Sequence, residues 1–149
     1  MTDTIPATGA CLCGRVRITA NAMPAELSCC HCSMCRKWAG GPFMAVECGT
    51  EVAFEGEEDI TRYESSEWGE RGFCRHCGSH LFYHLKPTGD YHIPAGLFDL
   101  DDTVSRRFAH QIFIDEKPDY YAFSNPTVEL TGAQVIAQFD AQQEEDQAP

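Results

Sequence analysis

The middle of the chain reads Cys74-Arg75-His76-Cys77-Gly78, and a related stretch near the N-terminus reads Cys11-Leu12-Cys13-Gly14. Thiols separated by one or two residues can reach the same tetrahedral ion at Zn–S distances of about 2.3 Å, whereas a disulfide needs only one partner for each cysteine. Each stretch ends in a glycine that lets backbone N–H groups turn toward the sulfurs. We therefore predict one zinc site formed by Cys11, Cys13, Cys74 and Cys77.

Four thiolates leave no coordination position open, so the zinc of this predicted site is expected to be structural. It would link the N-terminal strand to the middle of the chain. Two alternatives remain open from the residues alone. The cysteines could form two independent thiol pairs without a metal, or the four thiolates could bind iron instead of zinc.

A third cluster, Cys30-His31-Cys32-Ser33-Met34-Cys35, offers three thiols within six residues. Three protein ligands leave one position open for water or a substrate atom, which is the arrangement of catalytic zinc. We therefore predict a second, open zinc site on Cys30, Cys32 and Cys35. The expected total is two zinc ions per chain, with partial occupancy possible at the second site. The alternative is a closed site whose fourth ligand is Cys29, Cys48 or a histidine.

Length and composition favour one domain. At 149 residues the chain is long enough to bury one core, and we predict a single zinc-binding domain over residues 1–139. Residues 140–149 are acidic and rich in glutamine. We expect them to form a flexible C-terminal tail.

The charge of the chain limits the classes of partner. Acidic residues outnumber basic ones by 23 to 11, giving a formal net charge of −12. Such a field repels phosphate backbones and anionic membrane surfaces, so we expect no nucleic-acid and no membrane partner. The N-terminus shows no basic segment followed by an apolar run, and the nine cysteines are an odd number. These features predict a cytoplasmic protein with free thiols.

Short strands separated by turns dominate the rest of the sequence. β-Branched and aromatic residues are frequent in segments 15–19, 50–54, 60–63, 79–85, 91–94 and 109–114. Helix is indicated only at 33–38 and at 131–139, where Thr131 is a candidate N-cap and Val135, Ile136 and Phe139 form an apolar stripe. We predict a mainly β fold of short antiparallel sheets with at most one or two short helices.

Three motifs, in this order, resemble those of the glutathione-dependent formaldehyde-activating enzyme family, which includes the centromere protein V relatives. The resemblance extends from about residue 9 to residue 110. Its motifs are Gly9-Ala10-Cys11-Leu12-Cys13-Gly14-Arg15-Val16, Cys30-His31-Cys32-Ser33-Met34-Cys35-Arg36-Lys37 and Arg71-Gly72-Phe73-Cys74-Arg75-His76-Cys77-Gly78-Ser79-His80-Leu81.

The resemblance implies a β-tent fold with a structural zinc on the four-cysteine set and a catalytic-type zinc on Cys30, Cys32 and Cys35. It also implies a carbon–sulfur lyase reaction in which formaldehyde and glutathione condense to S-hydroxymethylglutathione. The expected partner is a small-molecule thiol or thiol adduct such as glutathione. Arg36, Lys37 and Arg71 are candidates to hold its carboxylates.

One departure from the family lies after residue 110. Family members often have a tryptophan shortly after a lysine that resembles Lys117, and here Tyr120 or Tyr121 takes that place. Relatives share their fold and metal sites more often than they share their reaction.

Two other functional hypotheses remain. A non-catalytic, zinc-stabilised β module could bind a protein partner through an aromatic patch of Trp38, Phe43, Trp68, Tyr120 and Tyr121. A thiol redox enzyme would need Cys48 as its reactive thiol. Cys29 and Cys48 are more simply explained as small apolar side chains in the core.

Overall fold

The computed structural model describes residues 3–147 and contains two compact units. The first unit holds the chain up to Leu27 together with Ala45–Arg107, and the second holds Ser28–Met44 and the chain from Phe108 onward. The single domain predicted for residues 1–139 stays a prediction.

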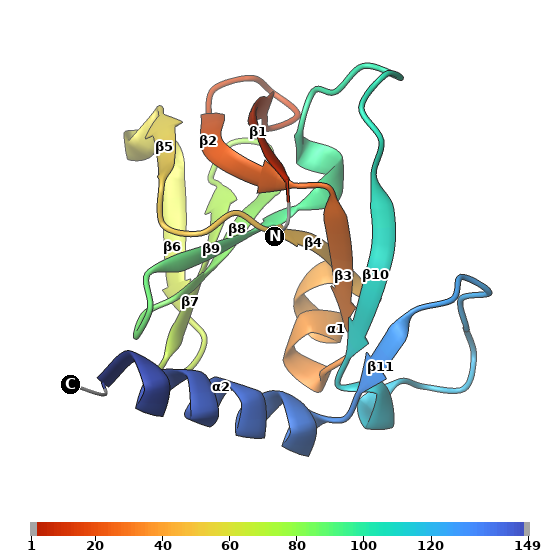
Figure 1. The fold of residues 1–149 in the computed structure, drawn as a ribbon. Helices are drawn as coiled ribbons and strands as arrows, with labels where there is room; N and C mark the ends of the chain where they lie inside the picture. The colour runs from red at the N-terminus through yellow and green to blue at the C-terminus, as the bar shows by residue number, and fades with distance from the viewer. Residues whose placement is uncertain (1–2, 148–149) are drawn as a thin grey trace. The chain divides into compact units, whose positions relative to one another are not determined.

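The first unit is built from antiparallel strands in two groups (Figure 1). One group has the order β1-β2-β5, with β1 at Thr4–Ala10, β2 at Arg17–Pro24 and β5 at Val52–Glu55. The other has the order β4-β9-β8-β7-β6, with β4 at Phe43–Glu47, β6 at Ile60–Glu64, β7 at Gly69–Cys74, β8 at His80–Leu85 and β9 at Asp90–Pro94. Short 3₁₀ turns lie at Glu57–Asp59 and Ala95–Leu97.

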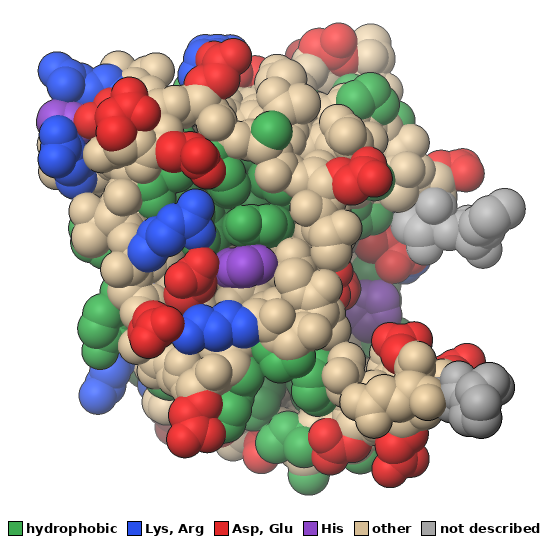
Figure 2. Space-filling model, turned by 90° about the vertical axis from the view of Figure 1, so that its left-hand side faces the viewer, with side chains coloured by type: hydrophobic (Ala, Val, Ile, Leu, Met, Phe, Trp, Pro, Cys, Tyr) green, Lys and Arg blue, Asp and Glu red, His purple; other side chains and the backbone are tan. Residues whose placement is uncertain are grey.

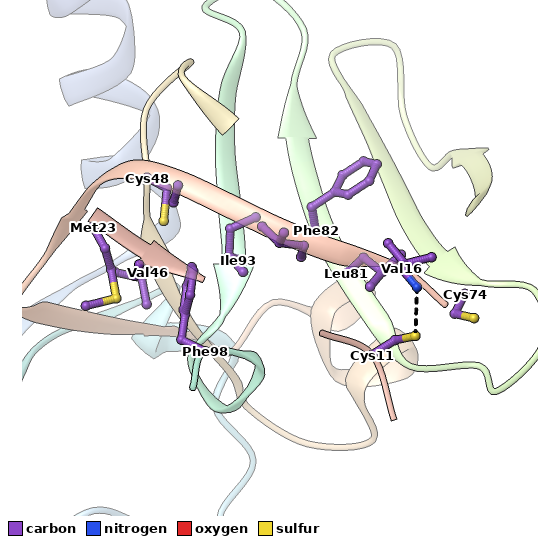
Figure 3. Packing of buried hydrophobic residues seen from close by; sticks show 13 residues of the cluster. Cys11, Val16, Met23, Val46, Cys48, Cys74, Leu81, Phe82, Ile93 and Phe98 are labelled. Atoms are coloured by element: carbon purple, nitrogen blue, oxygen red, sulfur yellow. Dashed lines mark hydrogen bonds between the residues drawn. The ribbon is translucent and has the colours of Figure 1, made fainter. Parts of the chain in front are cut away.

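The core of the first unit lies between these strands, as Figure 3 shows. Alternation along β2 buries Ile18 and Ala20 while their neighbours face outward, and Met23, beyond a register shift with β1, is buried as well. Phe82 of β8 is fully buried and packs its ring against the rings of Phe54 and Tyr91, with centroid distances of 5.2 and 5.3 Å. Aromatic pairs at this separation add to the stabilisation from buried area.

A conservative change in this core should have a small, measurable effect. Replacing Ile18, which is 1% exposed, with valine removes one buried methylene, and we expect a loss of about 0.5–1.5 kcal/mol in the free energy of unfolding by urea. Ile5→Val is the matched control, because Ile5 is 38% exposed on β1 and the loss should stay below about 0.5 kcal/mol. Equal losses in both variants would contradict the assigned core.

The second unit carries both helices. Its strands have the order β11-β10-β3, with β3 at Glu26–Cys30, β10 at Arg107–Ile112 and β11 at Val128–Leu130. β10 and β11 are parallel. Helix α1 spans Ser33–Ala39, a 3₁₀ turn spans Ile114–Glu116 and helix α2 spans Gly132–Gln147. Since most strand pairs are antiparallel, the predicted mainly β fold with two helices is confirmed, and its sheets are mixed.

Both helices begin where the sequence indicates. In α2 the Thr131 hydroxyl accepts the Gln134 N–H at 3.2 Å while the Gln134 side chain accepts the Thr131 N–H at 2.8 Å. This reciprocal pair is a capping box, so the predicted N-cap is confirmed. Ile136 is 56% exposed and does not belong to the half-buried stripe of Val135 and Phe139.

Helix α2 is longer than the predicted segment 131–139 and continues to Gln147. The part of the predicted tail that the structure describes is therefore helical, residues 148–149 lie outside the described residues, and the flexibility of 140–149 stays a prediction. Within the described part of the chain, neither helix has the length and apolar character that crossing a bilayer requires.

Candidate metal centre

The four cysteines paired from their spacing lie together in the first unit. The sulfurs of Cys11, Cys13, Cys74 and Cys77 all lie within 4.8 Å of one another. The Sγ atoms of Cys11 and Cys13 are 3.6 Å apart, and those of Cys13 and Cys74 are 3.7 Å apart. Sulfurs at about 2.3 Å from one zinc ion form a tetrahedron with edges of about 3.8 Å, whereas disulfide sulfurs are about 2.05 Å apart. The four-thiol cluster therefore fits a metal ion.

Two tight turns present these sulfurs. Cys11 directly follows β1 and Cys74 ends β7, and each is followed by a turn that closes on its carbonyl, through the N–H of Gly14 at 3.0 Å and of Gly78 at 2.8 Å. Both glycines have positive φ, 80° and 76°, which side chains rarely tolerate. Gly14 and Gly78 thus allow the chain to turn beside the thiols.

Hydrogen bonds to sulfur favour the thiolate form of two members of this cluster, Cys11 and Cys77. The Val16 N–H donates to Cys11 Sγ at 3.4 Å. A bond to the Ser79 hydroxyl, at 3.2 Å, lowers the pKa of Cys77 to about 5. Because metal ligands must be deprotonated, these bonds prepare the cluster for a cation.

The second cluster forms where β3 passes into α1. The sulfurs of Cys30, Cys32 and Cys35 all lie within 4.8 Å of one another. Cys30 ends β3, Cys32 is the N-cap of α1 and accepts the Cys35 N–H on its sulfur at 3.3 Å, and Cys35 lies in the first helical turn. The helix ends at Gly40, whose left-handed backbone (φ 81°) lets its N–H reach the Arg36 carbonyl. The end of β3 and the first turn of α1 thus bring three thiols together.

The protons of this three-thiol cluster are shared unequally. Hydrogen bonds with Cys30 and Cys35 lower the pKa of Cys32 to about 2, and the same contacts raise the pKa of Cys30. Neighbouring thiolates repel, so without a cation only part of the cluster can ionise. A divalent ion would relieve that repulsion and displace the remaining protons. The donor set therefore fits zinc, with no fourth group of the described chain in the cluster.

His31 lies between two of these thiols in sequence and is fully buried. Its Nδ1 lies 2.8 Å from the Tyr121 hydroxyl and its Nε2 lies 2.8 Å from Gln111 Oε1. Burial lowers the pKa of His31, which favours the neutral form of the ring. These partners cannot be predicted from the sequence, because no local pattern relates residues that lie 80 and 90 positions apart.

The three basic residues considered for substrate carboxylates have different environments. Arg36 donates from Nε to the His31 carbonyl at 2.9 Å, and Lys37 is exposed on α1. Arg71 is only 3% exposed and lies over the Tyr83 ring, 4.8 Å from its centroid. Arg71 is therefore part of the interior of the first unit, which makes it a poor candidate for a substrate carboxylate.

Cys29 and Cys48 are not members of either thiol cluster. Each is 1% exposed, and burial raises the pKa of each thiol to about 12. A reactive cysteine needs an accessible thiolate. The structure thus favours the apolar role for both and does not support Cys48 as a redox nucleophile.

The aromatic residues considered for a recognition patch differ in their exposure. Phe43 is buried, and Trp38 packs edge-on against it with a centroid distance of 5.4 Å. Tyr121 contacts His31. Trp68 and Tyr120 are exposed, at 53% and 75%, and belong to different units.

Comparison with known proteins gives consistent results. The family model for glutathione-dependent formaldehyde-activating enzymes matches residues 6–116. A Schizosaccharomyces pombe protein named an "uncharacterized lyase" is 37% identical over 129 residues, which cover 86% of this chain and 93% of that protein. A Halomonas elongata protein, named as a candidate glutathione-dependent formaldehyde-activating enzyme, is 34% identical over 83 residues, covering 50% of this chain and 53% of that protein.

Among solved structures, a crystal structure of a Rhodobacter sphaeroides protein superposes with a TM-score of 0.55 at 22% identity, covering 64% of this chain and 91% of that chain. This likeness concerns the fold alone. The family model covers well over half of the chain and includes both thiol clusters. The chain therefore belongs to the glutathione-dependent formaldehyde-activating enzyme family.

Proposed function

We propose that this protein is a zinc-dependent enzyme of the carbon–sulfur lyase type that acts on a small thiol adduct such as S-hydroxymethylglutathione. In the synthetic direction the thiol sulfur bonds to the formaldehyde carbon, and the thiol proton passes to the carbonyl oxygen. No oxidant or reductant takes part. The observation that carries the proposal is the cluster of three thiols without a fourth ligand in the described chain.

The two clusters are proposed to hold zinc in different roles. Cys11, Cys13, Cys74 and Cys77 would hold a structural ion, since four thiolates close the coordination shell. Cys30, Cys32 and Cys35 would hold the second ion in an open site and so form the catalytic centre. Zinc bound there would supply a Lewis acid and favour the thiolate form of a bound thiol.

The residues around the second cluster suit an anionic thiol such as glutathione. Cys35 is buried, whereas Cys30 and Cys32 are half-buried. Lys37, exposed two residues after Cys35, offers a cation for a carboxylate. Arg36 holds the His31 carbonyl and thereby fixes the backbone next to Cys32.

Charge supports a small-molecule substrate over a polyanion. The net charge of −12 opposes binding to nucleic acid or an anionic membrane. Acidic and basic side chains are interspersed on the face shown in Figure 2. We propose a cytoplasmic protein with neither of these partners.

Metal content per chain, measured by elemental mass spectrometry, tests the proposed sites. Wild-type protein purified without chelator should contain two zinc ions, and Cys32→Ser should contain one, because that substitution removes a ligand from the open site only. Cys29→Ser is the matched control, being adjacent to the cluster but outside it, and should keep two. One zinc in both wild type and Cys32→Ser would argue against the proposal and favour a zinc-stabilised binding module.

A further inference from the structure

Cys32 is held on both sides by one other segment of the second unit, Ile112–Tyr121. On its N-terminal side, the His31 N–H donates to the Ile112 carbonyl at 3.1 Å. On its C-terminal side, the Ser33 N–H donates to Glu116 Oε1 at 3.2 Å. The backbone N–H groups of the two residues next to Cys32, His31 and Ser33, are therefore both bonded to this segment.

The side chain of His31 adds a third connection to the same segment. Gln111 Nε2 donates to Thr127 Oγ1 at 2.9 Å, so its other amide atom, Oε1, faces His31 and accepts the Nε2–H. In a neutral ring Nδ1 then lacks a proton and accepts the Tyr121 O–H at 2.8 Å. The ring of His31 is thereby fixed at both nitrogens, which fixes the residue between Cys30 and Cys32.

The segment that makes these contacts is itself anchored at several points. Phe113 has a left-handed backbone (φ 54°), rare for a non-glycine residue, and its ring occupies the space where a side chain at position 132 would lie. Asp115 accepts the Gly132 N–H at 2.8 Å. Lys117 Nζ donates to the carbonyls of Tyr121, at 2.6 Å, and of Pro118, at 3.0 Å.

We propose that Tyr121 and Glu116 are positioning residues that hold Cys32 in the geometry needed to bind the second metal ion. They act through His31 and Ser33 and not by touching the metal. Outer contacts that orient metal ligands commonly contribute about 10- to 100-fold to metal affinity. The inference rests on the proposed function, since it assumes that Cys30, Cys32 and Cys35 bind a metal.

The Tyr121 contact is tested by metal affinity in the full-length protein. Tyr121→Phe keeps the ring and removes the O–H donor, so we expect zinc in the second site to be bound about 10- to 100-fold more weakly in competition with a chromophoric chelator. Tyr120→Phe is the matched control, because Tyr120 is adjacent and 75% exposed. It should bind zinc as wild type does.

The Glu116 contact is tested by loss and rescue. Glu116→Ala removes the acceptor for the Ser33 N–H and should weaken the same site, whereas Glu116→Gln keeps an acceptor oxygen and should restore most of the affinity.

Cobalt provides a second readout. The absorption bands of cobalt in the second site, obtained by subtracting the spectrum of Cys32→Ser, should shift in Tyr121→Phe and in Glu116→Ala, while those of the four-thiol site stay unchanged.

The outcomes separate the inference from the proposed function. If wild type binds two metal ions and Tyr121→Phe and Glu116→Ala match it in affinity and in cobalt spectrum, the positioning role is wrong and the proposed sites stand. If wild type binds only one, the open site is wrong and the positioning role with it. If Tyr121→Phe unfolds and loses both metals, the positioning role is tested by the metal affinity of Glu116→Ala compared with that of Glu116→Gln. Equal affinities in these two variants would then contradict it.

Discussion

Cys74→Ser is expected to leave the first unit unfolded at room temperature. Cys74 is fully buried in the core, close to Val16 and Leu81 in Figure 3, and its sulfur belongs to the four-thiol cluster. Structural zinc contributes on the order of 10 kcal/mol to folding in small zinc domains. A typical domain is stable by only about 5–15 kcal/mol. Loss of one ligand therefore removes most of the stability or all of it.

Circular dichroism and metal content measure this effect, and Cys48→Ser is the matched control. Cys48 is as buried as Cys74, in the same core, but lies outside the cluster. Its replacement buries one hydroxyl, with an expected cost of about 1–3 kcal/mol. Cys48→Ser should stay folded with its metal. A Cys74→Ser protein as stable as Cys48→Ser and still holding a metal at the four-thiol cluster would contradict the structural role.

Partial removal of metal is expected to abolish activity without unfolding the protein. The three-thiol cluster offers fewer ligands than the four-thiol cluster, so a chelator should empty it first. Metal ions contribute several kcal/mol of transition-state stabilisation in such enzymes, and each 1.36 kcal/mol is tenfold in rate. We expect the enzyme-dependent rate of thiol–formaldehyde condensation to fall at least about 100-fold.

Readdition of one equivalent of zinc should restore that rate, while the circular dichroism spectrum stays constant throughout. The spontaneous rate of condensation without protein is subtracted in each measurement. Cys32→Ser, which lacks one ligand of the cluster, should be inactive with and without added zinc. Full activity in Cys32→Ser, at a zinc content reduced by one equivalent, would rule out the proposed catalytic centre.

The thiol clusters could be predicted from the sequence because their geometry is mostly local. Cys32 and Cys35 are brought together by the first turn of α1, and Cys30 lies two residues before Cys32 at the end of β3, so the spacing itself indicates the cluster. Pairing the stretch at Cys11 with the stretch at Cys74 required one further inference. Each stretch supplies two thiols, and two such pairs complete one tetrahedral site. The structure places all four sulfurs within 4.8 Å of one another. Binding of zinc to either cluster stays a prediction.

Strands were missed where glycine or proline interrupts the expected residue pattern. β1 contains Pro6 and Gly9, and β7 contains Gly69 and Gly72. These glycines are required by packing, because a side chain at Gly9 would meet the Leu97 backbone and one at Gly72 would meet the Phe82 ring. The short strands β3, β4 and β11 were also missed. Tertiary contact, and not strand propensity, decides these positions.

The hydrogen-bond network around His31 lies beyond sequence reasoning for a different reason. Its members come from the position after β3, from β10 and from the segment before β11, and they are joined only by the fold. A buried histidine between two cysteines is ambiguous in a sequence, since it could ligate a metal or satisfy its nitrogens elsewhere. Here both nitrogens have protein partners.

The four-thiol cluster joins Cys13 to Cys74, which are 61 positions apart. A metal bound there cross-links the chain as a disulfide would, and closing a loop of that length removes entropy from the unfolded chain worth about 4 kcal/mol. Unlike a disulfide, such a cross-link needs no oxidising surroundings. A chain cut once between these residues would therefore stay joined through the metal, with Cys11 and Cys13 on one piece and Cys74 and Cys77 on the other.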